Sequence, residues 1–143
     1  MIKVGNAQLW VHDQEEALAF WTQKVGMEIR ADVTLPELGD FRWLAVGPAN
    51  QPDFAIVLMA IPGPPVMDAE TAGQVKELMA KGFAGTVFLV TDDCRASYEE
   101  LKSRGVEFTD EVSDAGYGLV THFRMPGDFQ VQLYQPRYAR NSR

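Results

Sequence analysis

Few side chains in this sequence could perform acid/base chemistry, and His122 is the only credible general base among them. An imidazole exchanges its proton near neutral pH, which suits it to a catalytic role. No serine or carboxylate partner can be placed beside His122 from the sequence. The other histidine, His12, stands next to Asp13 between an apolar run and a predicted helix, which is typical of a turn residue.

The single cysteine, Cys94, is the one candidate thiol nucleophile. It lies in the first turn of a predicted helix, where the helix dipole lowers the pKa of a thiol. We nevertheless interpret Cys94 as a small residue next to the helix cap. A lone cysteine cannot form an intramolecular disulfide, which favours a reducing compartment and a cytoplasmic location.

Two short segments alternate between apolar side chains and polar or aromatic ones, the pattern of a strand with one face in a core. They are residues 6–11 and the sequence FQVQLY at residues 129–134. The side chains expected to face a helix are Ala7, Leu9, Val11, Phe129, Val131 and Leu133. The opposite faces then carry Asn6, Gln8, Trp10, Gln130, Gln132 and Tyr134. Val120, His122 and Arg124 share one face of another strand, and if it is the same face, His122 joins these amides and aromatic rings.

An internal repeat provides the framework for these strands. Residues 11–29 align without a gap over residues 90–108, at a constant offset of 79. Val11 falls on Val90 and Gly26 falls on Gly105. A repeat of this length indicates two copies of one small supersecondary unit.

Each copy predicts a strand, a helix and three further strands. Asp13 and Asp92 stand at helix N-caps, and Gly26 and Gly105 stand where a left-handed residue ends a helix. An apolar stripe of the first helix contains Ala17, Leu18, Trp21 and Val25. The predicted strands are 7–11, 28–34, 41–46 and 54–60 in the first copy, and 85–90, 107–112, 118–125 and 129–134 in the second.

Residues 61–84 separate the two copies. The proline-rich residues 61–65 predict an extended connector. Asp68 then caps an additional helix that ends near Lys81, with Val75, Leu78 and Met79 as its buried stripe. We interpret this helix as a linker that packs on one copy, and a lid over a pocket is the alternative.

Composition excludes several classes of protein. The chain has 143 residues, enough for one compact unit, and a formal net charge of −7. An acidic surface repels phosphate backbones, so we expect no nucleic-acid partner. No apolar run approaches the roughly 20 residues that span a bilayer, and the N-terminus shows no signal-type segment, so we expect no membrane association.

The motifs V-x-D (Val11 to Asp13), F-W-x-x-x-x-G-M (Phe20 to Met27) and P-G-D-F-x-V-x-L (Pro126 to Leu133) sit within this tandem repeat. Together they resemble the vicinal oxygen chelate superfamily of glyoxalase I, bleomycin resistance proteins and extradiol dioxygenases. The resemblance implies an α+β fold in which tandem βαβββ modules form a cupped mixed sheet. It implies one domain, 1–143, made of a first module 1–60, a linker with a helix 61–84, a second module 85–136 and a tail 137–143.

The same resemblance implies where a metal would bind. Metal-dependent members carry ligands on the first and last strands of each module, and those positions fall here on Asn6, Val57, Gly85 and Gln132. Valine and glycine offer no side-chain ligand, and no carboxylate offsets the charge of a dication. We therefore expect no cofactor and no metal of the family type, and a divalent metal at a displaced position is the less favoured alternative.

We predict that the protein binds or sequesters a small planar or polyoxygenated organic molecule in the cup. The candidate ligand-binding residues are Asn6, Gln8, Trp10, Trp43, Val57, Met59, Gln130, Gln132 and Tyr134, and Trp43 lines either the cavity or the core. The alternatives are a lyase, isomerase or dioxygenase with a displaced metal or a catalytic His122, and an interaction module without a ligand. The resemblance also implies a homodimer.

Overall fold

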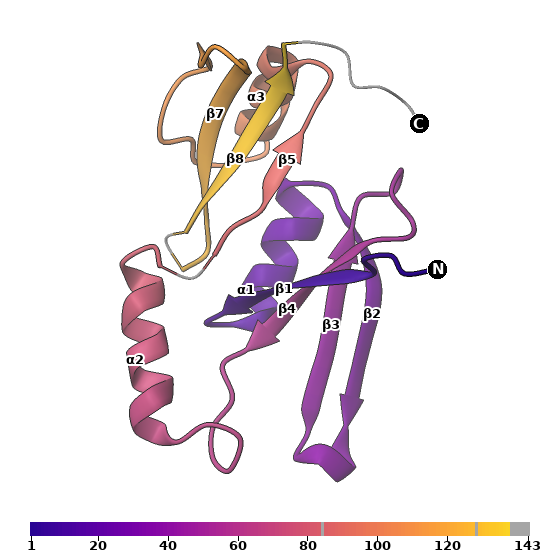
Figure 1. Cartoon of the computed structure of the whole chain (residues 1–143), viewed down its shortest axis with the longest axis vertical. Helices are drawn as coiled ribbons and strands as arrows, with labels where there is room; N and C mark the ends of the chain where they lie inside the picture. Colours follow the sequence, from indigo (N-terminus) through magenta and orange to yellow (C-terminus); the bar gives the residue numbers. More distant parts are fainter. Residues whose placement is uncertain (84, 128, 138–143) are drawn as a thin grey trace.

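The computed structural model describes residues 1–83, 85–127 and 129–137, without the side chain of Phe129. Most of the predicted tail 137–143 therefore lies outside the described residues. The chain forms two four-stranded sheets, of order β1-β4-β3-β2 and β5-β8-β7-β6 (Figure 1). In each sheet the first strand pairs parallel to the last strand, and the remaining pairs are antiparallel. The predicted α+β fold of two βαβββ units is thus confirmed.

The first unit follows the predicted order closely. Its elements are β1 (Asn6–Val11), α1 (Gln14–Ala19), the π-helix η1 (Phe20–Lys24), β2 (Glu28–Leu35), the 3-10 helix η2 (Pro36–Leu38), β3 (Phe41–Gly47) and β4 (Ala55–Ala60). The carboxylate of Asp13 caps α1 by accepting hydrogen bonds from the main-chain N–H groups of Glu15 and Glu16. Gly26, with φ +94°, ends the helical segment in the left-handed conformation that glycine adopts without strain.

The second unit departs from the predicted order at two strands. Its elements are β5 (Phe88–Val90), α3 (Cys94–Ser103), β6 (Ser113–Asp114), β7 (Gly118–Met125) and β8 (Phe129–Pro136). The strand predicted from residue 85 begins only at Phe88, because Gly85 has φ +82° and cannot continue a strand. The strand predicted at 107–112 is wrong, since this segment makes one isolated bridge, between Phe108 and Phe123. The cap of α3 is Asp93 and not Asp92.

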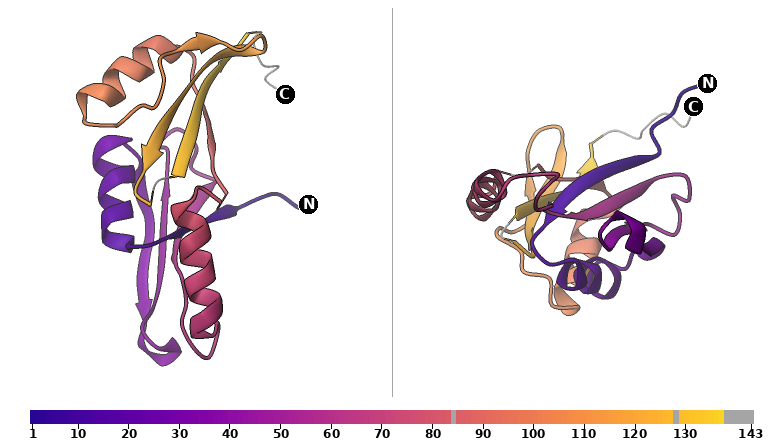
Figure 2. Two further views of the ribbon diagram at one scale, coloured as in Figure 1. Left: turned by 90° about the vertical axis from the view of Figure 1, so that its left-hand side faces the viewer. Right: turned by 90° about the horizontal axis from the view of Figure 1, so that it is seen from below.

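Between the units, α2 (Ala69–Ala80) is capped by Asp68, whose carboxylate accepts a hydrogen bond from Thr71 N–H at 2.7 Å. Met79 is buried and Val75 is partly buried, whereas Leu78 is 48% exposed. Leu78 was therefore wrongly assigned to the buried stripe. In the left view of Figure 2, α2 stands on one side of the strands and α1 on the other.

One hydrophobic core joins the two units. The rings of Phe20, from the first unit, and Phe123, from the second, have centroids 6.0 Å apart. Trp21, Leu44 and Leu58 are fully buried in the same cluster as Phe123 and Leu133. Because α1 and α3 lie on the same side of the molecule (Figure 2, left), the opposite faces of both sheets are left without either helix.

We call these faces, which neither α1 nor α3 covers, the outer faces. Strand register shows which side chains they carry, because directly paired residues point to the same side of a sheet. The outer face of the first sheet carries Asn6, Gln8, Trp10, Val33, Trp43, Ala45, Ala55, Val57 and Met59. The outer face of the second sheet carries Phe88, Val90, Val120, His122, Arg124, Gln130, Gln132 and Tyr134.

Candidate functional site

A cavity of about 480 Å³ lies at one end of the first outer face, where β1 and β4 end and the proline-rich connector begins. It contains three predicted ligand-binding residues, Gln8, Trp10 and Met59. Phe41 and the connector contribute further apolar surface. The complete lining is Gln8, Trp10, Gln14, Leu38, Gly39, Asp40, Phe41, Arg42, Met59, Ala60, Pro62, Gly63, Pro64, Pro65 and Val66.

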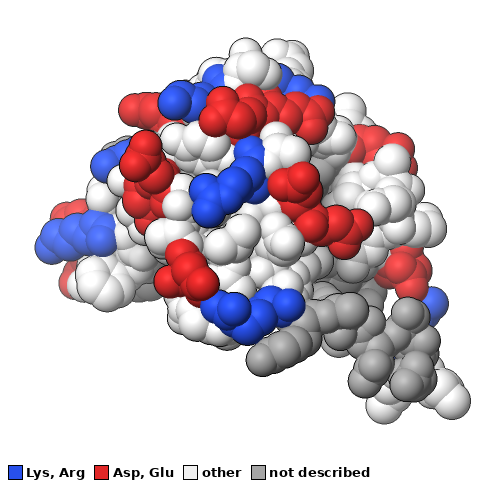
Figure 3. All heavy atoms as spheres, turned by 90° about the horizontal axis from the view of Figure 1, so that it is seen from above, with Lys and Arg blue, Asp and Glu red and all other residues white. Residues whose placement is uncertain are grey.

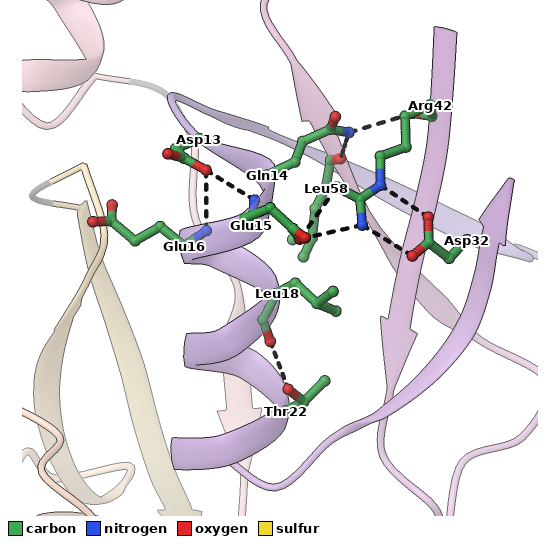
Figure 4. A network of polar contacts seen from close by, with 9 residues as sticks. All are labelled: Asp13, Gln14, Glu15, Glu16, Leu18, Thr22, Asp32, Arg42 and Leu58. Carbon is green, nitrogen blue, oxygen red and sulfur yellow. Dashed lines mark hydrogen bonds and ion pairs between the residues drawn. The ribbon is translucent and has the colours of Figure 1, made fainter. Parts of the chain in front are cut away.

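The pairing between β3 and β4 stops before it reaches this cavity. The ladder between β3 and β4 consists of the pairs Ala45–Val57 and Val46–Ile56. Beyond it, the side-chain amide of Gln14 donates to the main-chain oxygens of Leu58, at 2.8 Å, and Arg42, at 3.3 Å (Figure 4). Gln14 thus satisfies carbonyls that a continuous ladder would pair, and it belongs to the wall of the cavity. Sequence reasoning missed Gln14, because a polar residue at the start of a helix gives no signal of this role.

Arg42 brings a positive charge to the cavity wall, but two carboxylates neutralise it. Its Nε and Nη2 atoms lie 2.8 and 2.9 Å from the two oxygens of Asp32, and Nη1 lies 3.4 Å from Glu15 Oε2 (Figure 4). The hydrogen bonds from Arg42 hold the pKa of Asp32 below its ordinary value. The guanidinium of Arg42 is therefore paired with acidic side chains and adds no unpaired positive charge to the cavity wall.

The remaining predicted residues of the first unit lie on the outer face but do not line this cavity. Trp43 and Val57 belong to an apolar cluster on the outer face with Ala31, Ala45, Ala55 and Met59. Trp43 is thereby placed on the outer face and not in the main core, a choice that the sequence left open. Asn6 is exposed at the start of β1 and does not line the cavity.

The second outer face carries the polar residues of FQVQLY, apart from this cavity. His122 pairs with Gln132, Arg124 with Gln130, and Val120 with Tyr134. Gln132 Nε2 donates to the hydroxyl of Tyr117 at 2.9 Å, and Gln130 Nε2 donates to Thr109 Oγ1 at 3.4 Å. Both glutamines are therefore held in place by neighbours within the second unit.

His122 has the carboxylate partner that the sequence did not reveal. Its Nδ1 lies 2.8 Å from Asp110 Oδ2, and its main-chain N–H donates to Asp110 Oδ1 at 2.8 Å. Burial alone would raise the pKa of Asp110, but the hydrogen bonds from His122 and Thr121 outweigh it and lower that pKa. The sequence could not place this partner, because residues 107–112 run beside β7 without forming the predicted full strand.

Cys94 does not have the chemistry that a helix N-terminus suggests. The thiol is fully buried, and burial raises its pKa. The predicted lowering by the helix dipole is therefore wrong in direction, while the interpretation as a small packed residue agrees with the burial. His12 is exposed in the turn before α1.

Comparison with known proteins identifies the family. A family model described as the glyoxalase/bleomycin resistance protein/dioxygenase superfamily matches residues 3–133. The chain belongs to this superfamily. It is 31% identical over 135 residues to the uncharacterized protein YurT of Bacillus subtilis (strain 168), covering 94% of this chain and 99% of that protein.

Two solved structures of this superfamily's fold are similar to the chain. UcmS2 is 36% identical with a TM-score of 0.85, and the match covers 94% of this chain and 98% of that one. TnmS3, described as an antibiotic-binding protein from Streptomyces sp. CB03234, is 28% identical with a TM-score of 0.71, and the match covers 95% and 97%.

The positions to which the resemblance assigns metal ligands, Asn6, Val57, Gly85 and Gln132, carry no charged side chain. Val57 is 2% exposed within an apolar cluster, and Gly85 has no side chain. Asn6 and Gln132 are neutral amides on different sheets. Within residues 1–83, 85–127 and 129–137, no group of three or more His, Cys, Asp or Glu side chains could hold a metal ion. In the same part of the chain, no helix is long and apolar enough to cross a membrane.

Proposed function

We propose that this protein binds a planar, largely apolar organic molecule in the cavity beside Trp10. The observation that carries the proposal is the cavity itself, whose volume of about 480 Å³ is bordered by Trp10, Phe41, Met59 and the proline-rich connector. Ligand pockets typically have volumes of roughly 300–1,000 Å³ and mainly apolar walls with a few polar groups. Gln8 and Gln14 supply such polar groups here.

The similarity to TnmS3, an antibiotic-binding protein, supports binding of a small molecule over catalysis of a metal-dependent reaction. We propose that binding needs no metal, because the donor set at the family positions lacks a charged ligand. An indole ring provides a large flat surface for an aromatic ligand, and the neighbouring apolar side chains exclude water from its edge.

The first test uses Nile red, a neutral planar dye, as the probe. We expect Trp10→Ala to weaken its binding roughly tenfold, because the variant removes both stacking and apolar contact area. Fluorescence titration measures the affinity. We expect dialysis of the wild-type protein against EDTA to leave that affinity unchanged.

Trp43→Ala is the matched control, since Trp43 lies on the same outer face but does not line the cavity. It should change the affinity by much less than Trp10→Ala does. Equal affinities of the wild type and Trp10→Ala would refute binding beside Trp10. A loss of dye binding on EDTA treatment would refute metal-independent binding.

We also propose that two copies of the chain pair through the edge strands β2 and β5, which leaves His122 on the inner strand β7 accessible. Neither α1 nor α3 covers the outer faces of these strands (Figure 2), and large apolar side chains stand exposed on them: Val33 at 49%, Phe88 at 65% and Val90 at 48%. Apolar surface of this kind is typically covered by a partner. In contrast, the end of the molecule shown in Figure 3 carries interspersed acidic and basic side chains.

Sedimentation velocity tests the pairing. We expect the wild type to sediment as a dimer and the double variant Phe88→Lys/Val90→Lys to sediment as a monomer, because two buried ammonium groups oppose association. Leu78→Lys, on the exposed side of α2, should remain dimeric. A monomeric wild type at all concentrations would contradict this proposal.

A further inference from the structure

The Asp110 carboxylate is fixed at the border of β7 by three donors. Oδ1 accepts hydrogen bonds from the main-chain N–H of His122, at 2.8 Å, and from the hydroxyl of Thr121, at 2.9 Å. Oδ2 lies 2.8 Å from His122 Nδ1. The carboxylate thus holds both the main chain and the imidazole of one residue, which restricts the orientation of the ring on the second outer face.

This arrangement determines the proton positions on the imidazole. Because these hydrogen bonds outweigh burial and lower the pKa of Asp110, the carboxylate is ionised at neutral pH and can only accept hydrogen bonds. A neutral His122 therefore carries its proton on Nδ1, and Nε2 is left as an acceptor. Within the described residues Nε2 has no hydrogen-bond partner, and the imidazole side chain is 31% exposed.

The neighbouring glutamines supply further hydrogen-bond acceptors beside Nε2. Gln130 and Gln132 flank His122 on the outer face, and each donates one of its two amide N–H bonds to a neighbour, Thr109 or Tyr117. Their carbonyl oxygens are acceptors, like Nε2. The charged and titratable groups nearby are Asp110 and Glu111 in the segment before β6, Arg124 on β7, Tyr117 in the loop before β7 and Tyr134 on β8.

We propose that His122 and Asp110 form a proton-accepting site for an acidic hydroxyl group, a phenol or an enol, on a ligand bound at the second outer face. The ligand O–H donates to His122 Nε2. When the proton crosses, it leaves a ligand oxyanion and an imidazolium, and the Nδ1–H of that imidazolium faces the Asp110 carboxylate. No other atom changes partner, so the site requires no co-reactant.

A pair of coumarin probes tests this site. We expect 7-hydroxycoumarin to bind the wild type about tenfold more tightly than 7-methoxycoumarin, which has no proton to donate. The bound hydroxycoumarin should also ionise at a lower pH than the free dye, as followed by absorbance. His122→Gln and Asp110→Asn should abolish both the affinity ratio and the shift, whereas His12→Gln should retain them.

Equal affinities for the two probes, or loss of the ratio in His12→Gln, would overturn the proposal. Since Asp110→Asn removes contacts that also support the fold, a measurement on the wild type accompanies it. Nitrogen-15 NMR of histidine-labelled protein reports on two imidazole rings with two nitrogens each, and His122→Gln identifies the pair of signals from His122. We expect the neutral ring of His122 to be protonated on Nδ1, and protonation on Nε2 would equally refute the site.

Discussion

Phe123→Ala is expected to lower the free energy of unfolding by about 3–5 kcal/mol, the usual cost of removing a buried phenyl ring. Phe123 is fully buried on β7 and contacts Phe20 of the first unit and Phe108 of the second, with ring centroids 6.0 and 5.5 Å apart. Its loss leaves a cavity where the two units share their core. Urea denaturation at a fixed protein concentration measures the change.

The shared core also determines whether the two units unfold together or separately. Because residues of both sheets belong to one buried cluster, we expect one cooperative unfolding transition in the wild type and in the variant. Phe83→Ala is the matched control, since Phe83 follows α2 and is 72% exposed, and we expect a change within about 0.5 kcal/mol. Two separate transitions, or equal effects of the two substitutions, would contradict a common core.

Gly118→Ala is expected to destabilise the protein by about 3 kcal/mol, although it adds a single methyl group. An added Cβ at Gly118 would lie 2.2 Å from the main-chain oxygen of Gln135 and 3.1 Å from its carbonyl carbon. Main-chain atoms of β8 can move away only by distorting the ladder between β7 and β8. Circular dichroism during thermal and urea unfolding reports the loss.

Gly73→Ala makes the same chemical change with the opposite expected sign. Gly73 lies inside α2, and an added Cβ there meets no atom within 4 Å. Because alanine favours a helix interior over glycine, we expect a gain of about 1 kcal/mol. A Gly118→Ala variant of wild-type stability would show that the close approach of β8 does not exclude a side chain at 118. A destabilised Gly73→Ala variant would contradict the open space around Gly73.

Local sequence signals predicted most of the fold because they act over one turn or one strand. Gly26 and Gly105 both adopt the left-handed conformation expected at helix ends, with φ of +94° and +92°. The alternation in β8 correctly assigned Val131 and Leu133 to the core. Asp92 and Asp93 are both suitable N-cap residues for α3, and the sequence alone gives no basis for choosing Asp93.

Local sequence signals do not predict contacts between residues that are far apart in the sequence. Asp110 meets His122 only because residues 107–112 follow β7 without forming a full strand, and no periodicity encodes that path. Gln14 reaches the main-chain oxygens of Arg42 and Leu58 across 28 and 44 positions of sequence. The cavity could be anticipated through Gln8, Trp10 and Met59, but its boundary depends on these long-range contacts.

The proline-rich connector that borders the cavity belongs to neither sheet, and several of its residues are exposed. Substitutions in residues 62–66 can therefore alter the shape offered to a ligand while the side chains that stabilise the fold remain the same. Under the proposed function, residues 62–66 would contribute to ligand recognition without belonging to the hydrophobic core. Related proteins could thus diverge in ligand preference through the connector alone, without a compensating change in the core.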